Sequence, residues 1–170
     1  MKHDLVKLNE SDGSWDVFCA QWRDSCTLYD EDFETYARDA MPVLIDLVRQ
    51  PKEGAGVYAL RSEQGSFDAA CQANSTYLPG YTGKVLRVRH LLMSPHFDFG
   101  DYPIEDYSRV LARMFSRTIE LAKSDLPSEH IKFHLRSPAD RQFFEAMTEA
   151  LQAGGMSNVA LKGAWLYLTL

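Results

Sequence analysis

The stretch KVLRVRHLLM, residues 84–93, decides the fold because it is the strongest strand signal in the chain. Branched and apolar residues follow one another with few interruptions, which is typical of a strand covered on both faces. Ser94 and Pro95 end the run, since proline cannot donate the hydrogen bond that a central strand needs. We therefore expect a central strand over residues 84–93.

The patterns before this strand predict two helices and three further strands. Apolar residues at helical spacing indicate one helix over residues 15–26 and a second that starts near residue 30, which Pro42 should kink or split. Three segments are β-prone, the last two joined by a turn as in a hairpin: residues 4–9, 56–62 and 66–78.

The patterns after the central strand predict a loop, two helices and three short strands. The loop at residues 96–103 leads into a long amphipathic helix, and a strand at 131–135 follows. The next helix should begin with Ser137 as its cap, Pro138 at its first position and Asp140 three residues beyond the cap. Residues 158–170 split at a glycine into two short strands. We therefore expect an α/β (α+β) fold with a mixed, mostly antiparallel twisted sheet flanked by helices.

Composition narrows the classes of protein to which the chain can belong. With 170 residues and 45% hydrophobic residues, we expect one domain over residues 1–170. A net charge of −6 disfavours a nucleic-acid partner, and the absence of a long apolar run or an apolar leader indicates a cytoplasmic protein without a membrane span. The three cysteines lack CxxC spacing, so we expect buried thiols and no metal site.

The order of elements, and the run VRHLLMSP at residues 88–95 before a long helix, resembles the GNAT superfamily of acyl-CoA N-acyltransferases. The resemblance implies a V-shaped opening between the strands at 84–93 and 131–135, which would accept the pantetheine arm of coenzyme A. Acetyl-CoA or another acyl-CoA would then be the co-substrate. Backbone amides near Leu91, Leu92 and Met93 would face the acyl carbonyl and stabilise its developing negative charge.

The segment after the central strand departs from the family pattern. The family binds pyrophosphate with an R/Q-x-x-G-x-G/A loop, whereas residues 96–109 read HFDFGDYPIEDYSR, with Gly100 as the only glycine. Its four carboxylates would repel a polyanion. Alternatively, they stabilise the helix that follows by interacting favourably with its dipole. By resemblance, Gly100 and Arg136, which precedes a helix start, are the other candidates for cofactor contacts.

Candidate catalytic groups follow from position and chemistry. His90 and His96, within and just past the central strand, could deprotonate an amine, although a histidine inside a strand is more often structural. Tyr102 and Tyr107 are candidate acids by position. The family often uses a tyrosine on the helix after the strand at 131–135 as the acid, and the matching place in SPADRQFFE, residues 137–145, holds Phe144, which has no proton to give.

Two hypotheses for function remain open. The first is transfer of an acyl group from acyl-CoA to a small-molecule or protein amine. The second is a catalytically inactive GNAT-like binding or assembly module, for example a homodimer formed through the C-terminal strands. Arg109, Arg113 and Arg117 recur every four residues and could meet phosphates or a protein partner, or form an ordinary solvated helix face. Aromatic residues of the N-terminal helices, Tyr36 among them, are expected mostly in the core.

Overall fold

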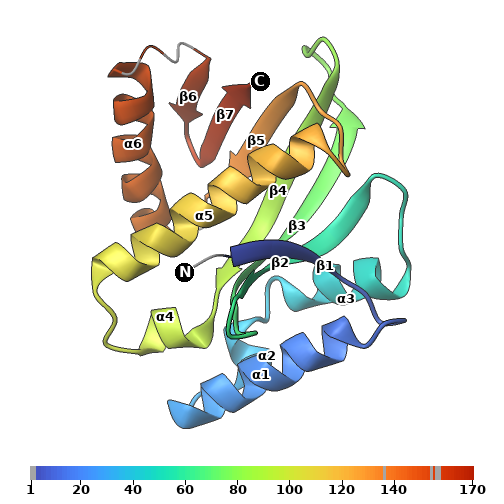
Figure 1. Ribbon diagram of the computed structural model, residues 1–170, viewed down its shortest axis with the longest axis vertical. Coiled ribbons are helices and arrows are strands. Elements are labelled where there is room, and N and C mark those ends of the chain that lie inside the picture. Colours follow the sequence, from blue (N-terminus) through green and yellow to red (C-terminus); the bar gives the residue numbers. More distant parts are fainter. Residues whose placement is uncertain (1–2, 136, 154, 156–157) are drawn as a thin grey trace.

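The computed structural model of the chain describes residues 3–135, 137–153, 155 and 158–170. In these residues seven strands form one sheet with the order β1-β2-β3-β4-β5-β7-β6 (Figure 1). Their bounds are β1 His3–Leu8, β2 Ala55–Ser62, β3 Phe67–Tyr77, β4 Lys84–Met93, β5 His130–His134, β6 Val159–Lys162 and β7 Trp165–Thr169.

The sheet is mixed and mostly antiparallel, as the sequence predicts. Strands β4 and β5 are parallel, and the other neighbouring pairs are antiparallel. The parallel pair requires a long crossover connection, and the chain between Met93 and His130 supplies it with helices. The predicted central strand therefore occupies the middle of the sheet.

Helices cover both faces of this sheet and produce two hydrophobic cores. Helices α5 (Ile104–Lys123) and α6 (Pro138–Ala153) pack on one face, together with residues such as Phe115, Phe133 and Phe144. Helices α1 (Ser14–Leu28), α2 (Phe33–Tyr36) and α3 (Met41–Arg49) pack on the other face around Phe18 and Trp22. Helix α1 is fixed to the sheet by the Trp22 indole, which donates a hydrogen bond to the carbonyl of Phe67 at 2.8 Å.

The predicted helix that starts near residue 30 is divided, as Pro42 suggested. Helix α2 is capped by Asp32, whose carboxylate accepts the backbone N–H of Thr35 at 2.8 Å. Pro42 lies in the first turn of α3, where proline fits because no intrahelical partner exists for its missing N–H. The proline therefore starts a new helix.

Two expectations about β4 and the segment after it were wrong. The loop expected at residues 96–103 contains a short helix, α4 (Pro95–Phe99), because Pro95 occupies a first-turn position and the N–H of Gly100 bonds the carbonyl of His96. Strand β4 is also not covered on both faces along its whole length. Arg87 and Arg89 are half-buried, since α1 to α3 pack on the β1–β3 side and reach only the end of β4.

Arginines of the predicted helical stripe fix the N-terminal strand. The guanidinium of Arg113 lies 2.8 Å from Nδ1 of the buried His3, and Nε of Arg117 donates to the His3 carbonyl at 2.8 Å. Nε2 of His3 in turn lies 2.6 Å from a carboxylate oxygen of Asp68 on β3. The third arginine, Arg109, pairs with Asp106 on its own helix. Two of the three therefore join α5 to β1.

Other sequence expectations concern membranes, metals and cysteines. Within the described residues no helix is long and apolar enough to cross a membrane. No cluster of side chains that could hold a metal ion occurs in the same part of the chain. Cys19, Cys26 and Cys71 are free and buried, as predicted, and burial raises the pKa of each thiol, to about 11 for Cys19 and Cys26.

Candidate functional site

The two parallel strands separate partway along their length. Residues Val85–Val88 of β4 pair with His130–Phe133 of β5, and beyond this point β4 continues to Met93 paired with β3 and no longer with β5. Here its pairing with β3 also shifts register, between Ala70 and Gln72, and His90 adopts a positive φ of 51°. The bulge re-aims the last residues of β4 at the gap that opens toward β5.

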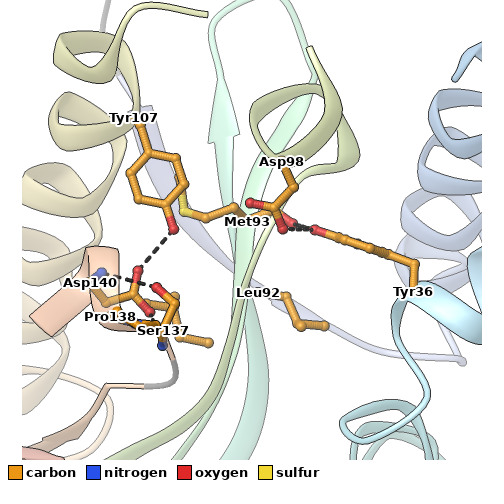
Figure 2. Close-up of a pocket in the computed structure, with 9 residues that line it drawn as sticks. Tyr36, Leu92, Met93, Asp98, Tyr107, Ser137, Pro138 and Asp140 are labelled. Carbon is orange, nitrogen blue, oxygen red and sulfur yellow. Dashed lines mark hydrogen bonds between the residues drawn. The ribbon is translucent and has the colours of Figure 1, made fainter. Parts of the chain in front are cut away.

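A cavity of about 350 Å³ lies at this gap, and we call it the fork cavity. Helices α2, α4, α5 and the start of α6 surround the end of β4 there (Figure 2). The residues that line it are Tyr36, Leu91, Leu92, Met93, Asp98, Tyr107, Ser137, Pro138 and Asp140. Segments far apart in the sequence therefore meet at one place.

The backbone of Met93 faces this cavity. The next residue, Ser94, donates its N–H to the carbonyl of Asp68 on β3 at 2.9 Å. Successive residues of a strand direct their backbone groups to opposite sides, so the N–H and C=O of Met93 point away from β3 and into the gap. The carbonyl accepts the hydroxyl of Tyr36 at 2.6 Å. The same alternation places the N–H of Met93 on the side of the strand away from β3.

Two tyrosine–aspartate pairs flank the end of β4, one on either side (Figure 2). On one side the Tyr36 hydroxyl lies 2.8 Å from a carboxylate oxygen of Asp98, so its single proton is shared between Asp98 and the Met93 carbonyl. Burial, and then Asp98, raise the pKa of Tyr36 well above its usual value. Tyr36 is therefore a neutral phenol that fixes α4 to the strand.

On the other side Tyr107 of α5 donates to Asp140 of α6 at 2.9 Å. Asp140 is 3% exposed and caps its helix as predicted, with its second oxygen 3.0 Å from the N–H of Ser137 and its own N–H donating to the Ser137 hydroxyl. Burial, and then Asp140, raise the pKa of Tyr107. A neutral hydroxyl, whose proton is donated to Asp140, thus stands at the gap.

The predicted cofactor residues are distributed unevenly. Leu91, Leu92 and Met93 line the fork cavity. Gly100 does not; its N–H is already bonded to His96, and the Tyr29 hydroxyl and the Tyr102 ring lie against it. Arg136 lies outside the described residues.

The predicted catalytic residues lie around the cavity without lining it. His90 is half-buried in the β4 bulge. His96 turns away to a separate hollow beside α1, where its Nδ1 lies 3.0 Å from the Tyr29 hydroxyl. Tyr102 is 49% exposed and packs on Phe97. Their assignment to catalysis stays a prediction.

Phe144 lies in the hydrophobic core and not at the cavity. It is fully buried, with its ring centroid 5.3 Å from that of Phe133 and 5.8 Å from that of Phe115. The tyrosine hydroxyls at the cavity come from α2 and α5. Tyr107 was a candidate by position, whereas Tyr36 was one of the aromatic residues of the N-terminal helices, most of which were expected in the core.

Comparison with known proteins gives matches by structure. No protein-family model matches the sequence, and no curated protein sequence matches it. A probable acetyltransferase from Staphylococcus epidermidis aligns with a TM-score of 0.57 at 13% identity, covering 99% of both chains. A second probable acetyltransferase aligns with a TM-score of 0.54 at 9% identity, covering 86% of this chain and 88% of that chain. A chimera of Vibrio cholerae spermidine N-acetyltransferase and hSSAT aligns with a TM-score of 0.50 at 9% identity, covering 99% of this chain and 96% of that chain. With β4 and β5 separating at the centre of a mixed sheet, the chain has a GNAT-like fold, which it shares with these solved structures.

Proposed function

We propose that this protein is an N-acyltransferase that moves an acetyl or related acyl group from acyl-CoA to an amine. The backbone N–H of Met93 carries this proposal, because it points into the gap between β4 and β5 and shares the fork cavity with the neutral hydroxyl of Tyr107. The solved structures with the same fold include an N-acetyltransferase that is named for the amine spermidine.

The residues of the fork cavity can divide the work of direct acyl transfer. Acyl-CoA would supply an activated thioester. The N–H of Met93 is a fixed donor for the carbonyl oxygen, on which negative charge builds during attack by the amine. Tyr107 would turn its proton from Asp140 to the departing sulfur, and Asp98, which is exposed at the cavity, would attract the cationic amine and accept its proton.

The phosphate end of coenzyme A fits this chain less well than the thioester end. Helix α4 stands after β4, where the family places its pyrophosphate loop, and the Gly100 N–H is occupied. Asp98, Asp101 and Glu105 are exposed in the segment that follows β4 and would repel a polyanion, whereas Asp106 is paired with Arg109. We therefore expect acyl-CoA to bind weakly. Removing the pyrophosphate from the ligand should lower the affinity further by only a small factor.

Helix α4 also favours a second candidate function, a binding or assembly module without catalysis. A chain that had kept the fold and lost the phosphate contacts would bind neither acetyl-CoA nor free coenzyme A. Titration with acetyl-CoA and with free coenzyme A therefore distinguishes the acyltransferase from the binding module.

The first experiment is calorimetric titration with acetyl-CoA and with free coenzyme A at low salt and neutral pH, followed by a thiol-release assay with a panel of amines. We expect saturable binding of acetyl-CoA, and in Tyr107→Phe a fall in kcat of about 10²-fold or more with little change in acetyl-CoA affinity. Tyr77→Phe, at a residue 72% exposed on β3, is the control and should keep full activity. If no heat of binding is measured at millimolar acetyl-CoA, the acyltransferase proposal is contradicted and the binding or assembly module is favoured.

A further inference from the structure

A second cavity, of about 340 Å³, lies on the opposite side of β4 from α5, and we call it the sheet-face cavity. Helix α3 and the turn that leads into β2 form one wall, and strands β3 and β4 form the other. It shares no lining residue with the fork cavity. Its lining residues from the sheet include Gln72, Asn74 and Arg89.

These three side chains carry buried polar atoms without a hydrogen-bond partner among the described residues: Gln72 Oε1, Asn74 Oδ1 and Arg89 Nε. One further buried side-chain atom of this kind occurs in that part of the chain, on Thr148, so they are concentrated at this cavity. Gln72 is only 9% exposed, so bulk water reaches little of it. Unsatisfied buried polar groups destabilise a folded protein, and a cluster of them calls for a specific explanation.

The register of the sheet places these three side chains on one face, close to one another. Gln72 and Arg89 are direct partners across the β3–β4 ladder, and side chains in such pairs stand about 5 Å apart on one face. Asn74 follows two residues later on β3 and therefore points to the same face. A ligand a few atoms across can contact all three.

The charges at this cavity indicate a ligand that carries one negative and one positive group. Arg89 has no ion pair in the described part of the chain, and burial, and then the nearby Arg87, lower its pKa. A guanidinium in such a place is stabilised by an anion. The amide oxygens require donors instead. On the opposite wall Asp46 is already paired with Lys52 at 3.5 Å, so it is the carboxylate of Glu53 that favours a positive group.

We propose that the sheet-face cavity binds a small amino-acid-like zwitterion. Its carboxylate accepts the Nε–H of Arg89, and its ammonium group donates to the side-chain oxygens of Gln72 and Asn74. The two charged groups of an α-amino acid share one carbon, so they can bridge side chains that face each other across a ladder. Cavities of this volume are typical of sites for small molecules. This site is independent of acyl-CoA binding.

The test uses thermal unfolding and calorimetry of the full chain with each free L-amino acid, and with propionate and ethylamine as probes that carry one charged group each. We expect at least one amino acid to raise Tm in a concentration-dependent way, whereas propionate and ethylamine do not. Arg89→Met and Gln72→Met should weaken that binding at least tenfold. Arg87→Met is the matched control, because Arg87 lies on the same face two residues earlier and does not line the cavity.

Stability of the free protein separates a ligand site from a structural role. Methionine has nearly the volume of glutamine and no polar group, so Gln72→Met should raise the Tm of the free protein if the amide oxygen is unsatisfied until a ligand binds. A fall in Tm would mean that water or protein already satisfies Gln72, and it would overturn the proposal. Absence of any Tm change at millimolar amino acid, or equal binding of propionate, would overturn it as well.

Discussion

Replacing Tyr107 with phenylalanine removes one hydroxyl from the fork cavity and leaves the ring in place. That hydroxyl donates to Asp140 at 2.9 Å, and Asp140 is 3% exposed, so water replaces the lost donor poorly. A hydrogen bond to a charged group contributes about 1.5–3 kcal/mol, and no void is left behind. We therefore expect the free energy of unfolding to fall by about 2 kcal/mol, which corresponds to roughly 4–8 °C in Tm for a domain of this size.

Urea unfolding followed by the fluorescence of the buried Trp15 and Trp22 measures this change. Asp140→Asn alone also weakens the cap of α6, so the double variant is needed to isolate the coupling between the two side chains. A loss below about 0.5 kcal/mol in Tyr107→Phe, or a coupling energy near zero, would refute the hydrogen bond described above. Tyr77→Phe, on an exposed residue, should stay within about 0.5 kcal/mol of the unchanged protein.

Three further predictions concern the core, the N-terminal strand and alkaline pH. Phe144→Tyr should lower the free energy of unfolding by about 1–3 kcal/mol in urea and give no gain in thiol release, because its hydroxyl would enter a fully buried cluster of aromatic rings. His3→Phe should lower Tm by several degrees, since Asp68 loses a hydrogen bond of 2.6 Å and the Arg113 guanidinium loses its contact with the ring. Burial raises the pKa of Tyr58 from 10.0 to about 12, so the folded protein keeps a proton that the unfolded chain releases. Its contribution to stability is complete below pH 10 and is lost as the pH rises toward 12, and Tyr58→Phe should flatten the fall in unfolding free energy over that interval.

Each of these predictions has a control or an outcome that contradicts it. For His3, the matched variant is Asp4→Asn, because the Asp4–Arg117 ion pair is exposed and should contribute little. An unchanged stability of Phe144→Tyr would mean that a buried partner exists for the new hydroxyl. Parallel stability curves above pH 10 for the unchanged protein and Tyr58→Phe would show that this tyrosine does not titrate differently on folding.

The sequence predicted the elements whose signals are local and redundant. Strand β4 was placed correctly because a run of branched residues ends at Ser94 and Pro95. The start of α6 was placed correctly because Ser137 and Asp140 satisfy each other's backbone N–H groups, an arrangement that depends on residues three apart. The order of such elements was sufficient to indicate the GNAT-like sheet.

The candidate sites could not be predicted in the same way, because long-range packing assembles them. The fork cavity joins Tyr36 to Asp98 and Tyr107 to Asp140, and no local pattern relates the members of either pair. Gln72 sat in a strand pattern that does not distinguish a satisfied amide from an unsatisfied one. Helix α4 was missed because proline was taken to end a strand, and the same residue also starts a helix.

The short β4–β5 ladder has a consequence for how the chain reaches this structure. Strands β2, β3 and β4 are joined by tight connections at residues 63–66 and 78–83, so they can pair early, whereas Val85 and His130 meet only after residues 94–129 have closed a long loop. Helix α5 lies within that loop and must pack on the sheet as the loop closes. We expect this late contact to set the folding rate, so the opening that forms the candidate site would be created in the slowest step of folding.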